Sequence, residues 1–168
     1  MKKTSFLNKL KDEKKLQIVE PSKEIAKAYL IKSEKSLRSA KATNDIKNYE
    51  DSVALAYYSM YYSLLALLFD VGIKCENHTG AIILLKKVFG IDNSQISKAK
   101  KERVDKQYYV DFSVTEKDVL DMIAIAEDFN AELMNFIDKL TNEEIKTFRE
   151  AASREMGGNR HYDKDISG

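Results

Sequence analysis

The sequence predicts an all-α protein, an antiparallel helical bundle with an extra C-terminal helix. Its 168 residues include only six glycines and one proline, and so few helix-breaking residues favour helices over strands and turns. Apolar residues recur at helical spacing along most of the chain, and no useful stretch alternates apolar and polar residues as a half-buried strand does. With 43% hydrophobic and 33% charged residues, the composition is typical of one soluble globular domain.

The N-terminal part is charged and then becomes amphipathic. Residues 1–20 form an N-terminal extension, in which a short helix is expected near 6–15. The bundle begins at Pro21, and Ser22 is a suitable N-cap for a helix over 22–43. Apolar residues line one side of this helix and basic residues line the other, so the pattern predicts an amphipathic helix with a basic exterior.

The segment 45–71 is the most apolar part of the chain. It has apolar residues on two helical faces and is followed by Gly72, which suits the left-handed position after a helix. A helix that is apolar on two faces is buried centrally or shared with another subunit. Residues 52–69 have the length of a membrane span, but their four tyrosines and three serines favour a buried core helix without membrane contact.

Further segments have helical periodicity: 81–89, 94–106, 115–139 and 141–156. Thr79 is the expected cap of the first. Thr115 with Asp118, and Thr141 with Glu144, have the spacing of capping boxes. We therefore expect a helical bundle over 21–140, a C-terminal helix over 141–156 and a flexible tail over 157–168.

The charges are unevenly distributed along the chain although the net charge is only +1. Residues 1–41 carry an excess of seven positive charges, and 107–155 an excess of seven negative charges. Residues 86–106 hold seven basic and three acidic side chains. This pattern indicates either a basic face for an anionic partner or oppositely charged helices packed side by side. The single Cys75 and the lack of an apolar leader at the N-terminus predict a cytoplasmic protein.

Several short motifs follow one another in a definite order. They are Ala54-Leu-Ala-Tyr57-Tyr58-Ser59-Met60-Tyr61-Tyr62-Ser63, Gly72-Ile73, His78-Thr79-Gly80, Arg103 followed by Tyr108-Tyr109, and Ala126 with Phe129. In this order they resemble the HEPN family (higher eukaryotes and prokaryotes nucleotide-binding domains), and most closely its prokaryotic toxin–antitoxin branch. The resemblance extends over about two thirds of the chain.

Apolar residues on two faces of 52–69 exceed what one partner helix covers, so we expect a homodimer. The resemblance implies a protein that binds RNA or nucleotide, has no cofactor and pairs with a nucleotidyltransferase antitoxin. Active members of the family are metal-independent ribonucleases that use an Arg-x(4–6)-His motif across the dimer interface. Here Tyr108 and Tyr109 stand where that histidine is expected after Arg103. A tyrosine with a pKa of about 10 is a poor general base at pH 7, so we expect slow cleavage or none.

The candidate catalytic residues are therefore Arg103, Tyr108 and Tyr109. The candidate nucleic-acid-binding residues are Lys100, Lys101, Arg103, Lys106 and Tyr109, because arginine binds phosphate through paired hydrogen bonds and tyrosine stacks on bases. Arg103 and Tyr109 are expected in a cleft shared by two subunits. One alternative stays open, in which Arg103 pairs with a carboxylate of its own chain and the tyrosines only pack.

Other combinations of residues are weaker candidates for a metal-binding or catalytic site. Zinc needs three or four ligands, and Cys75 and His78 supply two with His161 as the only other imidazole, so no metal site is expected. Arg154 and His161 have the motif spacing, but a Gly-Gly pair between them prevents a fixed geometry. His78 is expected to orient the turn after the long helix. Three functions remain, with enzymatic activity left open: a nucleotide- or RNA-binding protein, a non-catalytic interaction scaffold, and a weak metal-independent endoribonuclease.

Overall fold

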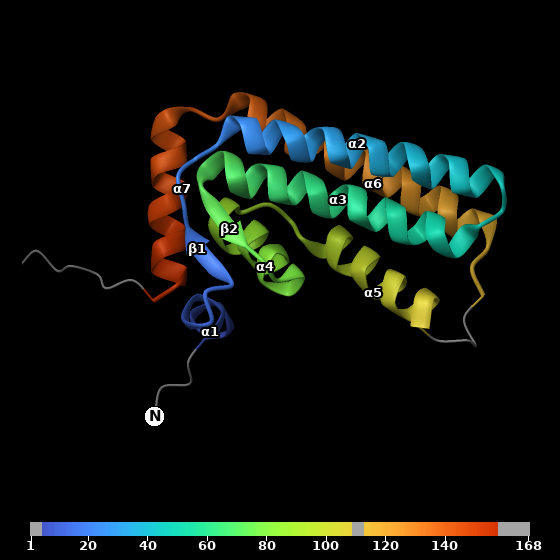
Figure 1. The fold of residues 1–168 in the computed structure, drawn as a ribbon, viewed down its shortest axis with the longest axis horizontal. Helices are drawn as coiled ribbons and strands as arrows, with labels where there is room; N and C mark the ends of the chain where they lie inside the picture. The colour runs from blue at the N-terminus through green and yellow to red at the C-terminus, as the bar shows by residue number, and fades with distance from the viewer. Residues whose placement is uncertain (1–4, 109–112, 158–168) are drawn as a thin grey trace, which may run out of the picture.

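The computed structural model describes residues 5–108 and 113–157, except for the side chains of 105–108. Its elements are α1 (Phe6–Asp12), β1 (Leu16–Ile18), α2 (Lys23–Asp45), α3 (Tyr49–Val71), β2 (Ile73–Cys75), α4 (His78–Phe89), α5 (Ser94–Tyr108), α6 (Glu116–Lys139) and α7 (Asn142–Glu155). The long helices α2, α3 and α6 run side by side along the longest axis, and α7 crosses one end of them (Figure 1). This arrangement confirms the predicted all-α bundle.

Helix α3 forms the centre of the bundle, as its two apolar faces predict. It contacts α2, α4, α5, α6, α7 and β2. Its side chains at helical spacing are fully buried: Val53, Tyr57, Met60, Leu64 and Leu67. Among the described residues, α3 is the one helix that is long and apolar enough to cross a membrane, but 78% of its most apolar window is buried inside the protein. It is therefore the core helix of the bundle.

The helix ends follow local sequence signals in most places. The Ser22 side chain accepts a hydrogen bond from the Ile25 amide, and Thr115 and Thr141 each complete a capping box. Gly72 ends α3 with a φ of 84°, a left-handed conformation that glycine adopts without steric cost. The beginning of α4 differs from the prediction, because Asn77 and not Thr79 is its cap.

The chain before α2 packs on the same core as the bundle. Leu7, Leu10 and Leu16 are buried, and β1 pairs with β2 in an antiparallel two-stranded sheet. The register places Leu16 opposite Cys75 and Ile18 opposite Ile73. The sequence did not predict this sheet, because three-residue strands are too short to show an alternating pattern.

The C-terminal helix α7 is fastened to the end of α3. Arg149 donates hydrogen bonds to the backbone carbonyls of Val19, Val71 and Gly72. The last carbonyls of a helix have no partner within it, so an arginine from another element is a suitable donor. Of the predicted tail, residues 158–168 lie outside the described residues.

A small polar network crosses the bundle between its three long helices. Ser33 of α2 donates to the Ser59 carbonyl at 2.7 Å and bonds the Ser63 hydroxyl. Asn130 of α6 accepts from Ser63 and donates to the Ser59 hydroxyl. Buried hydroxyls need such partners, so the network favours one relative register of α2, α3 and α6.

Candidate functional site

The aromatic side of α3 meets the first turn of α4 at His78. The Tyr57 side chain is fully buried, and its hydroxyl lies 2.7 Å from Nδ1 of His78. On the next turn, the Tyr61 ring stacks on the imidazole with 3.8 Å between ring centroids. His78 is thus held by α3 on two sides, and it joins the beginning of α4 to the core.

Arg103 of α5 lies against the same aromatic side. Its Nη1 donates to the Tyr58 hydroxyl at 2.8 Å, and its guanidinium carbon lies 5.3 Å from the ring centroids of both Tyr57 and Tyr58. These are cation–π distances. No carboxylate among the described residues forms an ion pair with Arg103, and its buried Nε has no hydrogen-bond partner there. The positive charge of Arg103 is therefore stabilised by the uncharged side chains of Tyr57 and Tyr58.

Lys100 lies one turn before Arg103 on α5, on the same side of the helix. Its ammonium donates to the Thr79 hydroxyl at 3.1 Å, directly beside His78. Four side chains from two helices therefore gather at one place: His78 and Thr79 of α4, and Lys100 and Arg103 of α5. We call this group the α4–α5 basic cluster.

The protonation of His78 follows from its surroundings. Burial lowers the pKa of His78, and the nearby charges of Arg103 and Lys100 lower it further, so the imidazole is neutral at pH 7. Burial also raises the pKa of Tyr57, which therefore keeps its hydroxyl proton. Among the described residues, Nδ1 of His78 is the partner available to this proton. We infer that Nδ1 accepts it and that Nε2 carries the imidazole proton.

The HEPN domain family model matches residues 26–140, about two thirds of the chain. The chain belongs to the HEPN domain family. This confirms the resemblance inferred from the motifs. Membership points to nucleotide or RNA binding or to ribonuclease-type function, and HEPN proteins often form dimers. No curated protein matches the chain.

The HEPN match includes the whole α4–α5 basic cluster. Of the residues proposed from sequence, Lys100 and Arg103 come together there, whereas Lys101 is exposed on α5. Lys106 and Tyr108 lie where side chains are not described, and Tyr109 lies outside the described residues, so their roles stay predictions. His78 and Thr79 were not among the site residues predicted from sequence. Their motif was noticed, but no local signal connects it with Arg103.

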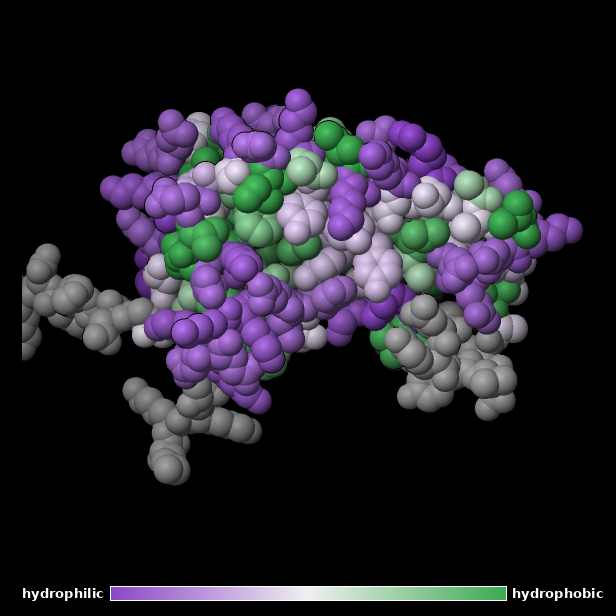
Figure 2. Space-filling model, in the orientation of Figure 1, coloured by the Kyte–Doolittle hydropathy of each residue, from purple (hydrophilic) through white to green (hydrophobic). Residues whose placement is uncertain are grey.

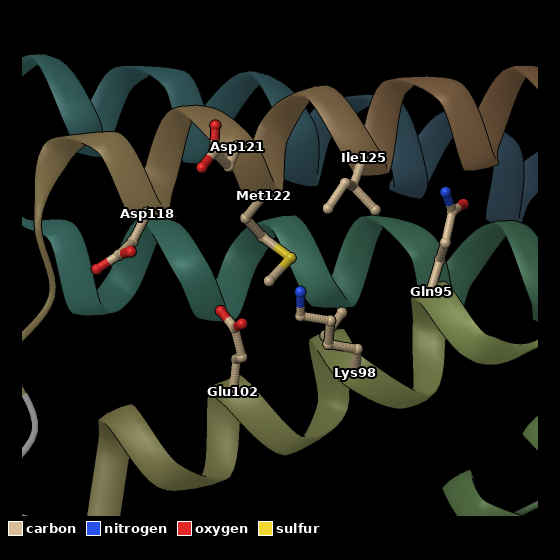
Figure 3. Close-up of a pocket in the computed structure, with 8 residues that line it drawn as sticks. Gln95, Lys98, Glu102, Asp118, Asp121, Met122 and Ile125 are labelled. Carbon is tan, nitrogen blue, oxygen red and sulfur yellow. The ribbon is translucent and has the colours of Figure 1, made fainter.

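Another side of α5 has a different chemical character in this HEPN bundle. A hollow of about 170 Å³ lies between α5 and α6 (Figure 3). Its lining residues are Gln95, Lys98, Ala99, Glu102, Asp118, Asp121, Met122 and Ile125. Three carboxylates against one lysine make this hollow unsuited to a phosphate group. Within the described residues, no group of three or more side chains is placed to hold a metal ion.

An aromatic row leads from α2 across α3 toward Arg103. The rings of Tyr29 and Tyr62 stack with centroids 6.1 Å apart, and those of Tyr62 and Tyr58 with centroids 6.2 Å apart. The Lys32 ammonium lies 4.7 Å from the Tyr62 centroid. Figure 2 shows pale and green surface running across the middle of this HEPN face, bordered by hydrophilic purple. The HEPN bundle thus presents a weakly polar strip beside a cationic cluster.

Proposed function

We propose that this HEPN protein binds single-stranded RNA or nucleotide through phosphate contacts at the α4–α5 basic cluster. The observation that carries the proposal is the environment of Arg103. The guanidinium rests on Tyr57 and Tyr58 without an ion-pair partner among the described residues. A guanidinium in this state retains N–H donors for a phosphate, which it binds through a planar pair of hydrogen bonds. Lys100 supplies a second positive charge beside it.

Cleavage of the bound RNA is expected to be slow or absent. General acid–base catalysis contributes about 10²–10⁴-fold to such reactions and needs a group that exchanges a proton near neutral pH. The residues after Arg103 supply tyrosines in place of the histidine of the active family motif. The weak ribonuclease therefore remains the second candidate, with Arg103, Tyr108 and Tyr109 as its residues.

We further propose a cytoplasmic homodimer that pairs with a nucleotidyltransferase in a toxin–antitoxin module. The half-buried aromatic row on α2 and α3 supports the dimer, because such a strip is a suitable surface for a second copy. Arg103 lies at one end of this row, so the two basic clusters would border the interface. Sedimentation as a 19 kDa monomer at micromolar concentration would contradict the dimer.

RNA binding is tested by fluorescence anisotropy with a labelled single-stranded oligomer at several salt concentrations. For single strands the slope of log K against log [salt] is about −0.7 for each phosphate contact. Contacts from Arg103 and Lys100 together predict a slope of about −1.4. Arg103→Ala should weaken binding and bring the slope to about −0.7.

Arg38→Ala is the matched control for the loss of one arginine. Arg38 is exposed on α2, and its ion-pair partner among the described residues is Glu34 on its own helix. Its removal should leave the RNA affinity nearly unchanged. Equal affinities for both variants, or no binding of RNA at low salt, would overturn the proposal, and the second result would favour the interaction scaffold. Rapid cleavage of the oligomer that survives Arg103→Ala would contradict the assigned site.

A further inference from the structure

We infer that the α4–α5 basic cluster takes a terminal phosphate, the phosphomonoester of a nucleotide or of an RNA end, and that His78 takes up a proton when this group binds. The inference rests on the proposed function, since it concerns the same cluster. It goes beyond it by naming the form of the phosphate and by assigning His78 a role in holding it.

The α4–α5 basic cluster carries two positive charges on α5. Lys100 and Arg103 lie one turn apart on α5, and neither is ion-paired to a carboxylate of the described residues. Two uncompensated positive charges match a phosphomonoester, which carries nearly two negative charges at pH 7. A phosphodiester within an RNA strand carries only one. The cluster is therefore better matched to the end of a strand than to its middle.

His78 is positioned beside both cations. Lys100 reaches Thr79, the next residue along α4, and Arg103 shares the rings of Tyr57 and Tyr58 with the imidazole. A phosphate that contacts both cations would therefore lie beside His78. With Nδ1 engaged by Tyr57, Nε2–H is the donor that His78 can offer to a phosphate oxygen.

The proton uptake of His78 depends on the charges around it. The groups that face His78 are the tyrosines of α3, and Lys100 and Arg103 of α5. The charged ones are cations, and they favour the neutral imidazole. A bound dianion reverses this local field, so the imidazole gains a proton from solvent. The proton enters at Nδ1, and the Tyr57 hydroxyl oxygen then accepts a hydrogen bond from Nδ1–H.

The experiment compares three RNA oligomers of one sequence, with a 5′-phosphate, with a 3′-phosphate or with neither. Their affinities are measured by titration calorimetry at pH 6.5 and pH 8.0, in buffers of different ionisation enthalpy. We expect one phosphorylated end to bind at least about tenfold more tightly than the unphosphorylated oligomer. Uptake of one proton changes affinity by at most about tenfold per pH unit, so binding should tighten about three- to tenfold as the pH is lowered.

Variants separate the role of His78 from the titration of the ligand. His78→Gln should lose the proton uptake and keep only the pH dependence that the phosphate itself causes. Tyr57→Phe keeps the aromatic packing but removes the hydroxyl partner of Nδ1, and should alter the pH profile. The pKa of His78 can also be measured without substituting this residue, from its imidazole signal in nuclear magnetic resonance. In a His161→Ala protein, the pKa of His78 should rise when the phosphorylated oligomer binds.

The outcomes distinguish this inference from the proposed function. Equal affinity for all three oligomers, with Arg103→Ala still weakening them, would overturn the preference for a terminal phosphate and leave the proposed function intact. A preference without proton uptake, and with an unchanged His78 signal, would overturn the role of His78. No binding of any oligomer would overturn both.

Discussion

Replacement of Arg149 by alanine should destabilise the protein through the end of α3. The Nη1 of Arg149 lies 3.0 Å from the Val71 carbonyl oxygen and 3.2 Å from that of Gly72, and it also donates to Val19. These carbonyls belong to the end of α3 and to the segment that follows β1. One nitrogen therefore joins the C-terminal helix, the core helix and the N-terminal segment.

The magnitude follows from these contacts. A hydrogen bond to a charged group contributes about 1.5–3 kcal/mol, and a single nitrogen shared among several carbonyls counts as little more than one such bond. The half-buried position of Arg149 reduces this further, so we expect a loss of about 2 kcal/mol in unfolding free energy. For a domain of this size, each kcal/mol shifts Tm by about 2–4 °C. The expected fall in Tm is therefore about 4–8 °C.

The assay is thermal unfolding followed by circular dichroism or calorimetry. Arg154→Ala is the matched control, because Arg154 is exposed on the same helix. Its effect should stay within about 0.5 kcal/mol, as for most surface substitutions. If both variants lose the same stability, or if Arg149→Ala melts like the unaltered protein, the three carbonyl contacts do not fasten α7.

Three further predictions concern stability. Gly72→Ala should lower the Tm more than Gly90→Ala, because a Cβ at position 72 would lie 2.0 Å from Arg149 Nη1, whereas no atom of the described residues other than its chain neighbours lies within 4 Å of a Cβ at position 90. Equal losses of Tm would contradict this. Asn130→Ala should lower the free energy of unfolding, measured with denaturant, by about 1–3 kcal/mol, because it removes one hydrogen-bond partner from each of the buried Ser59 and Ser63 hydroxyls. The pKa of His78 is lowered in the folded protein, so His78 binds more protons in the unfolded chain than in the folded one. The free energy of unfolding should therefore fall as the pH drops below about 6.5, and His78→Gln should reduce this pH dependence.

The sequence predicted those features of the fold that depend on neighbouring residues. Ser22, Thr115 and Thr141 cap helices through contacts three residues away, and Gly72 adopts the conformation that its position after an apolar helix requires. The central burial of α3 was predictable because its own residues are apolar on two faces. Each of these features depends only on residues within one short segment of the chain.

Features that join distant segments were not predictable in the same way. The pairing of β1 with β2 depends on the packing of α1 and α3, which no three-residue pattern encodes. Arg103 was identified from its motif, but its neighbours His78 and Thr79 come from another helix. Only the packing of α4 and α5 on α3 brings these side chains together, so a spacing rule along the chain cannot find them.

Elements from before and after the long helices, α1 with β1 and α7, pack at one end of the bundle (Figure 1). This packing limits where the protein can be truncated. The family match covers residues 26–140, but buried side chains lie on both sides of it: Leu7, Leu10, Leu16, Ile145, Ala152 and Met156. A fragment that ends at residues 26 and 140 would expose the apolar surface that these residues cover. It would also lose the hydrogen bonds that Arg149 of α7 donates to the end of α3. Fusion junctions placed before Ser5 or after Gly157 keep all of these buried side chains and Arg149 in the protein.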